Sequence, residues 1–67
     1  MYLASDTSSV SVYAMNEEDK LNVIEEVIRG TKVVSLNKEI IYEDVNYTEI
    51  EYNGGKYYVL NDSLVNN

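Results

Sequence analysis

The chain has 67 residues and a net charge of −7, with twelve acidic and five basic side chains and neither histidine nor cysteine. A chain this short forms one domain at most, and it lacks the residues for a disulfide or for the usual zinc sites. The negative charge argues against binding to nucleic acid, whose phosphates require clustered Lys and Arg, and against anionic membranes. The first residues carry neither a basic nor an apolar region, so we expect no signal peptide in this segment, and no apolar run is long enough to span a membrane. We therefore expect one monomeric domain over residues 1–67, as a fragment of a longer protein.

Residues that favour strands recur along most of the chain. The stretch 10–12 alternates Val-Ser-Val, which predicts a short strand. Residues 30–36 are expected to form another strand, entered through a glycine. The stretches 40–42 and 45–47 look like strand ends on either side of an acidic turn at 43–44. These segments predict an all-β fold.

The segment from Asn16 to Gly30 supports two opposite interpretations. Asn16 could cap a helix with acidic residues in its first turn, and Gly30 could end that helix. Four apolar residues then recur at helical spacing: Leu21, Ile24, Val27 and Ile28. The same segment is rich in Val and Ile, which favour strands. The local pattern alone supports both a strand and a helix, and a helix would make the fold α+β.

The C-terminal part predicts a hairpin. Residues 48–52 alternate apolar and acidic side chains, residues 53–55 read Asn-Gly-Gly, and residues 56–60 return as a second strand. A turn at 53–54 pairs Ile50 with Tyr57, whereas a turn at 54–55 pairs Ile50 with Val59. Both registers place Ile50, Tyr52, Tyr57 and Val59 on one face and Tyr58 on the other.

The order and spacing of these segments resemble the bacterial SH3-like (Src-homology-3-like) domains of cell-wall and secreted proteins. The resemblance rests on residues 10–13, on 23–36 with its central glycine, on 47–59 with its Asn-Gly turn, and on 61–64. It implies an SH3-like barrel of about five short antiparallel strands, with residues 23–28 as a strand. It leaves room for one helical turn in the Ala14–Leu21 loop. Tyr13 stands where the family has an Arg, and Tyr47 stands where the family commonly has a Trp.

The chain offers little for catalysis. Without His or Cys, the common pairs of a nucleophile and a base are absent. The acidic runs at 17–19, 25–26 and 43–44 are typical of solvated surface, and the run 16–19 lacks the ligand spacing of a calcium loop. We expect no enzyme activity, no metal site and no cofactor.

The seven tyrosines are the most informative residues, because tyrosine combines an apolar ring with a hydrogen-bonding tip. We expect Tyr52 and Tyr57 to pack in the core. The outer face of the hairpin and the resemblance to groove positions of the family give four ligand-binding candidates, expected to form an exposed patch: Tyr13, Tyr42, Tyr47 and Tyr58.

The resemblance implies a non-catalytic binding module of a bacterial envelope or secreted protein. Such a module recognises a peptide-like ligand, for example a peptidoglycan peptide, and targets an attached domain to it. An aromatic groove with an acidic rim suits a ligand with free amines. The alternative is a structural or protein-interaction domain with no free ligand. A connected tyrosine patch favours the first reading and a flat aliphatic face favours the second. The extracellular or cell-envelope location rests on the resemblance alone.

Overall fold

The computed structural model describes residues 1–66, and within them every regular element except one short 3₁₀ turn is a β-strand. In chain order the elements are β1 (Tyr2–Leu3), β2 (Ser9–Met15), β3 (Leu21–Ile28), β4 (Val34–Tyr42), β5 (Val45–Tyr52), β6 (Gly55–Leu60), the 3₁₀ turn η1 (Asn61–Ser63) and β7 (Leu64–Val65). The predicted all-β fold is therefore confirmed.

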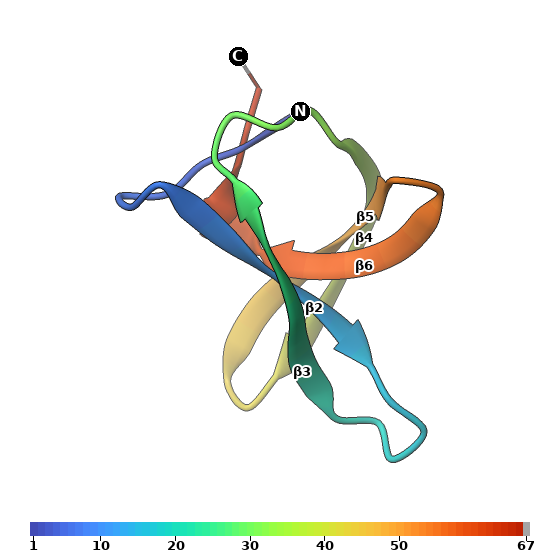
Figure 1. Cartoon of the computed structure of the whole chain (residues 1–67). Helices are drawn as coiled ribbons and strands as arrows, with labels where there is room; N and C mark the ends of the chain where they lie inside the picture. Colours follow the sequence, from blue (N-terminus) through green and yellow to red (C-terminus); the bar gives the residue numbers. More distant parts are fainter. Residues whose placement is uncertain (67) are drawn as a thin grey trace.

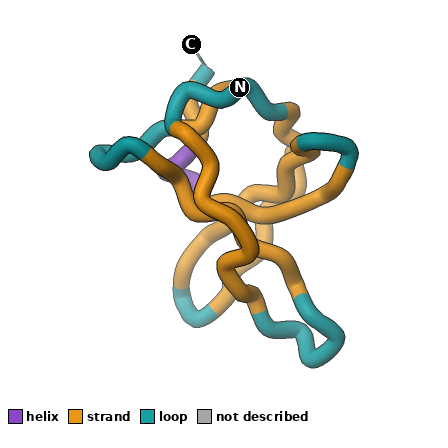
Figure 2. The backbone as a smooth tube through the Cα atoms, viewed as in Figure 1, coloured by secondary structure: helices purple, strands orange, loops and turns teal. Residues whose placement is uncertain are grey.

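Five of the strands form one antiparallel sheet in the order β3-β2-β6-β5-β4. Figure 1 shows that this sheet is strongly twisted, with β2 and β3 in front of β4 and β5. The strands β1 and β7 pair separately and bring the two ends of the chain together. Short loops join nearly continuous strands (Figure 2).

The segment from Asn16 to Gly30, which supported both a helix and a strand, contains the strand β3. The helical interpretation is therefore wrong. The β-branched residues of this segment form β3, which pairs along its whole length with β2. The helical turn for which the resemblance leaves room in the Ala14–Leu21 loop is also absent from the structure. Instead, Oδ1 of Asn16 accepts hydrogen bonds from the backbone N–H groups of Glu18 (2.9 Å) and Lys20 (3.0 Å). An Asn side chain that binds its own following backbone closes a tight turn and does not start a helix.

The pairing of β2 with β3 contains a shift of one residue. Val12 pairs with Glu25 and Tyr13 pairs with Val23, which leaves Ile24 as an extra residue on β3. Because cross-strand partners share a face, such a bulge moves the following residues to the opposite face. Val27 therefore stays with the core residue Val10, whereas Val23 joins the face of Tyr13.

The C-terminal hairpin adopts the first of the two predicted registers. Ile50 pairs with Tyr57, and the turn residues Asn53 and Gly54 have φ angles of 51° and 81°. A two-residue hairpin turn that matches the twist of its two strands requires positive φ at both central residues. Gly55 follows, and a Cβ there would lie only 2.6 Å from the hydroxyl oxygen of Tyr57. The ring of Tyr57 therefore covers the backbone where Gly55 has no side chain.

The strand expected over residues 30–36 begins later than predicted. Residues 30–33 bond to the N-terminal segment, with the N–H of Leu3 donating to the carbonyl of Thr31 (2.9 Å). The strand β4 starts at Val34 and continues to Tyr42, through an irregularity between Ser35 and Glu39. Its end and the start of β5 flank the acidic turn at 43–44, as predicted.

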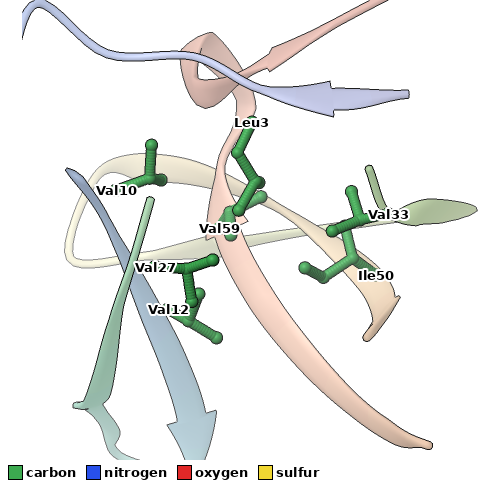
Figure 3. Close-up of a cluster of buried hydrophobic side chains, with 7 residues drawn as sticks. All are labelled: Leu3, Val10, Val12, Val27, Val33, Ile50 and Val59. Carbon is green, nitrogen blue, oxygen red and sulfur yellow. The ribbon is translucent and has the colours of Figure 1, made fainter. Parts of the chain in front are cut away.

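The core is a cluster of aliphatic side chains that point toward one another from both layers of the sheet (Figure 3). Its buried members are Leu3, Val10, Val12, Val27, Val33, Ile50 and Val59. Tyr52 and Tyr57 pack against this cluster, as predicted. Each fully buried aliphatic side chain contributes about 1.5–3 kcal/mol to folding. This cluster holds the sheet that positions the tyrosines described next.

Candidate functional site

Four tyrosines from four different strands lie on the opposite side of β5 from the aliphatic core, and we call them the tyrosine cluster: Tyr13 (β2), Tyr42 (β4), Tyr47 (β5) and Tyr58 (β6). The ring of Tyr47 is at the centre. Its centroid lies 5.2 Å from that of Tyr13 and 6.4 Å from that of Tyr42, and both pairs are edge-to-face. Tyr58 is the cross-strand partner of Tyr13 and so shares its face. The structure thus brings all four candidate residues to one face.

The cluster is less exposed than predicted. Tyr47 is only 8% exposed, so the expectation that it is exposed is wrong. It is covered because the rings of Tyr13 and Tyr42 pack on it from two sides. The other three members are half-buried. The solvent-facing part of the cluster therefore belongs to Tyr13, Tyr42 and Tyr58, while Tyr47 is buried.

Two carboxylates flank the cluster. Burial raises the pKa of Tyr47, and the neighbouring Tyr13, Glu43 and Tyr42 raise it further. Burial also raises the pKa of Tyr58, and the adjacent Glu49 adds to that effect. Both hydroxyls therefore remain neutral at physiological pH and can donate hydrogen bonds. Neutral rings beside negative charges favour a cationic group as ligand.

Aliphatic residues extend this face beyond the tyrosines. By register, Val23 is paired with Tyr13, Ile40 with Tyr47, and Val45 with Tyr42. Val23 is 52% exposed and Val45 is 40% exposed. Sequence reasoning missed these residues. The pairing around the acidic turn could have indicated Ile40 and Val45, but Val23 reaches this face only through the bulge in β3.

Other kinds of site were sought within residues 1–66. No three His, Cys, Asp or Glu residues gather there closely enough to hold a metal ion. That part of the chain also contains no helix of the length and apolarity needed to cross a membrane.

Comparison with known proteins gives no relative for this arrangement. No family model, curated protein or solved structure matches the chain. The function is therefore argued from the site itself.

Proposed function

We propose that this chain is a non-catalytic binding module with an SH3-like barrel fold, and that the tyrosine cluster recognises a peptide-like ligand with a free amine. A peptidoglycan peptide has this chemistry. The module would target an attached domain to that ligand in the cell envelope or outside the cell.

The observation that carries the proposal is that Tyr13 and Tyr42 pack on the buried ring of Tyr47 and that Tyr58 shares their face. Rings held by a packed partner lose little conformational freedom when a ligand binds, which favours affinity. Aromatic residues with hydroxyl tips are common binding anchors because they offer apolar area and hydrogen bonds together. The segment that links the edge strands β3 and β4 bonds to β1, and β1 pairs with β7; these connections around the edges of the sheet support the barrel.

The charge of the molecule supports the choice of ligand. The chain carries a net charge of −7, and Glu43 and Glu49 lie beside the cluster. An ammonium group would be attracted by this field and could rest on a tyrosine ring face. Anionic polymers would be repelled.

The test is an amide NMR titration of the labelled chain with soluble peptidoglycan fragments. We expect shifts that concentrate on Tyr13, Tyr42, Tyr58 and Glu49. The variant Tyr58→Phe keeps the ring and removes one hydroxyl, and it should weaken binding. Its matched control is Tyr52→Phe, which removes a hydroxyl that donates to Glu25 (3.5 Å) outside the cluster. A folded chain whose tyrosine cluster does not respond at millimolar fragment would contradict the proposal.

A second candidate is a structural or protein-interaction domain with no free ligand. It is favoured by the aliphatic residues exposed on the edge strand β3, where Val23, Ile24 and Ile28 are 52%, 49% and 75% exposed. Exposed apolar residues on an edge strand suit packing against another protein surface. Under this function the tyrosines serve packing alone, and the titration above would leave them unmoved.

A further inference from the structure

The strand β3 is one outer edge of the five-stranded sheet, and within residues 1–66 its only neighbouring strand is β2. Just beyond the strand, the N–H of Arg29 donates to the carbonyl of Ser8 on the β2 side (3.1 Å). Backbone groups of an antiparallel pair point alternately toward and away from the partner strand, so those of Ile28 and Glu26 point away from β2. On that side the carbonyl of Ile28 accepts bonds from the N–H (3.3 Å) and the hydroxyl (2.6 Å) of Thr31. The N–H of Ile28 and both backbone groups of Glu26 have no backbone partner within the described residues.

The side chains along this edge follow an apolar, acidic, apolar order. Glu26 pairs with Ser11 and Ile28 pairs with Ser9, so both lie on the face of the sheet away from the aliphatic core. Ile24 stands two residues before Glu26, and both isoleucines are exposed. An added strand would therefore meet one carboxylate between two apolar side chains.

The carboxylate of Glu26 is held in place by two serines of β2. The hydroxyl of Ser11 donates to its Oε2 (2.6 Å) and the hydroxyl of Ser9 donates to its Oε1 (3.2 Å). A carboxylate has about four lone-pair sites, so each oxygen can still accept a bond from a ligand. A side chain that is already oriented loses little conformational freedom on binding.

The charge around this edge selects a basic partner. Residues 9–29 contain five acidic and two basic side chains, and β2 has none of either kind. Lys20 adjoins the acidic run 17–19, and the guanidinium of Arg29 donates to the carbonyl of Ser5 (3.4 Å). Acidic residues on an edge strand oppose pairing with another acidic chain, and a second copy of this chain has the same net charge of −7.

The opposite edge of the sheet, β4, lacks these features. Three of its residues, 36–38, stand opposite the single residue Glu49 of β5, which interrupts the ladder. Its charged residues Lys38 and Glu39 are adjacent and opposite in sign, so they select neither kind of partner. The strand β3 has one extra residue, Ile24, but its pairing is regular over residues 25–28.

We propose that an extended segment of a partner protein adds to β3 as a further strand. Its backbone bonds to Glu26 and to the N–H of Ile28. A Lys or Arg of the segment lies opposite Glu26, and apolar residues two positions to either side cover Ile24 and Ile28. Such addition to a sheet edge takes affinity from main-chain hydrogen bonds and specificity from alternate side chains. The inference names a partner for the exposed β3 edge and does not depend on whether the tyrosine cluster binds a ligand.

The experiment is an amide NMR titration of the labelled chain with an acetylated and amidated heptapeptide, Thr-Val-Thr-Arg-Thr-Val-Thr. We expect shifts over residues 25–28, while Tyr42 and Tyr58 stay unmoved. The matched probe has Glu in place of Arg and should bind at least fivefold more weakly, because it places like charges opposite each other. A third probe carries an N-methyl group on the Arg nitrogen. It should also bind at least fivefold more weakly, because it lacks the N–H that bonds to Glu26.

Two variants locate the charge. Glu26→Lys should reverse the preference, so that the Glu probe binds about fivefold more tightly than the Arg probe. Glu51→Gln is the control. It removes one negative charge from β5, which β6 and β2 separate from β3 in the sheet, and it should leave the preference unchanged.

Equal binding of the Arg and Glu probes would overturn the selection by charge. Equal binding of the N-methylated probe would overturn the addition of a strand. Shifts confined to the tyrosine cluster, or no shift at millimolar peptide, would overturn the inference as a whole. If Glu26→Lys does not fold, the three probes on the natural chain decide.

Discussion

The strand β5 separates two different environments. On one face Ile50 is completely buried among aliphatic side chains of five other segments. On the other face Tyr47 is also buried, at 8% exposed, but the rings of two half-buried tyrosines cover it. The first face is closed on all sides, whereas the second is closed only by residues that themselves meet solvent.

We expect the two faces of β5 to have different roles, one in stability alone and the other in stability and binding. Aliphatic side chains offer a partner no directed contact, so their burial serves stability alone. Tyrosines at the solvent boundary keep their hydroxyls available, so the same packing also prepares a surface. Substitutions on the two faces should therefore separate loss of stability from loss of binding.

The largest effect is expected for Ile50→Ala. Removing this side chain leaves a cavity in the aliphatic core and should lower the free energy of unfolding by about 3 kcal/mol. A chain of this size has little stability to spare, so the variant would be largely unfolded. Urea unfolding followed by circular dichroism measures the loss. Ile50→Val, with an expected loss of about 1 kcal/mol, remains measurable if the first variant does not fold. A loss at Ile50→Ala no larger than this would show that the core is not closed.

A substitution in the turn at residues 43–44, beside the tyrosine cluster, should increase the free energy of unfolding. Glu43 and Asp44 have positive φ angles of 50° and 66°, as Asn53 and Gly54 have in the other hairpin turn. Neither Glu43 nor Asp44 is a glycine. Asp44→Gly should raise the free energy of unfolding by about 1 kcal/mol, since glycine adopts this conformation without a steric penalty.

The converse variant, Gly54→Asp, is the control for this turn. Nothing lies within 4 Å of the Cβ that it would add, so any loss comes from backbone conformation and the added charge and not from a steric clash. We expect a loss of about 1 kcal/mol in the same urea experiment. A neutral result for both variants would show that the two turns do not limit stability.

Tyr13→Leu tests directly whether the tyrosine face contributes to binding as well as to stability. It removes one edge-to-face contact to Tyr47 and should lower the free energy of unfolding by about 1 kcal/mol. Binding of peptidoglycan fragments should fall more than this loss of stability explains, when both are measured at a temperature where the variant stays folded. Binding that is unchanged would make Tyr13 a packing residue only.

The smallest effect is expected at alkaline pH. The pKa values of Tyr47 and Tyr58 are raised above the ordinary 10.0, so the unfolded chain ionises before the folded one. Their contribution to stability is full below pH 10.0 and is lost as the pH rises through the folded pKa values. Tyr47→Phe should reduce this alkaline sensitivity, measured as the shift of the urea midpoint across pH 10.0. An unchanged sensitivity would mean that other groups cause it.

Local chemistry explains which parts of the fold could be predicted. The hairpin at 53–54 follows from alternation and turn residues that lie next to each other in the sequence. The segment 21–28 could not be decided locally, because its pairing with β2 selects the strand. The strands β1 and β7 have two residues each, too few for any periodic signal.

The sequence predicted which tyrosines share a face, but not how deeply each one is buried. Alternation placed Tyr58 opposite Tyr57, and the resemblance grouped it with Tyr13 and Tyr47. Alternation assigns a residue to a face but does not say what covers that face, so the burial of Tyr47 was missed.

The pairing of β1 with β7 has a consequence for how the chain could be rewired. Tyr2 and Val65 are cross-strand partners, so a short flexible connector could join the two ends without moving either strand. New ends could then be opened at the exposed turn 17–19, which Figure 1 shows at the opposite end of the molecule from both termini. Such a circular permutant should keep the same sheet, because chain order would change while every strand keeps its neighbours.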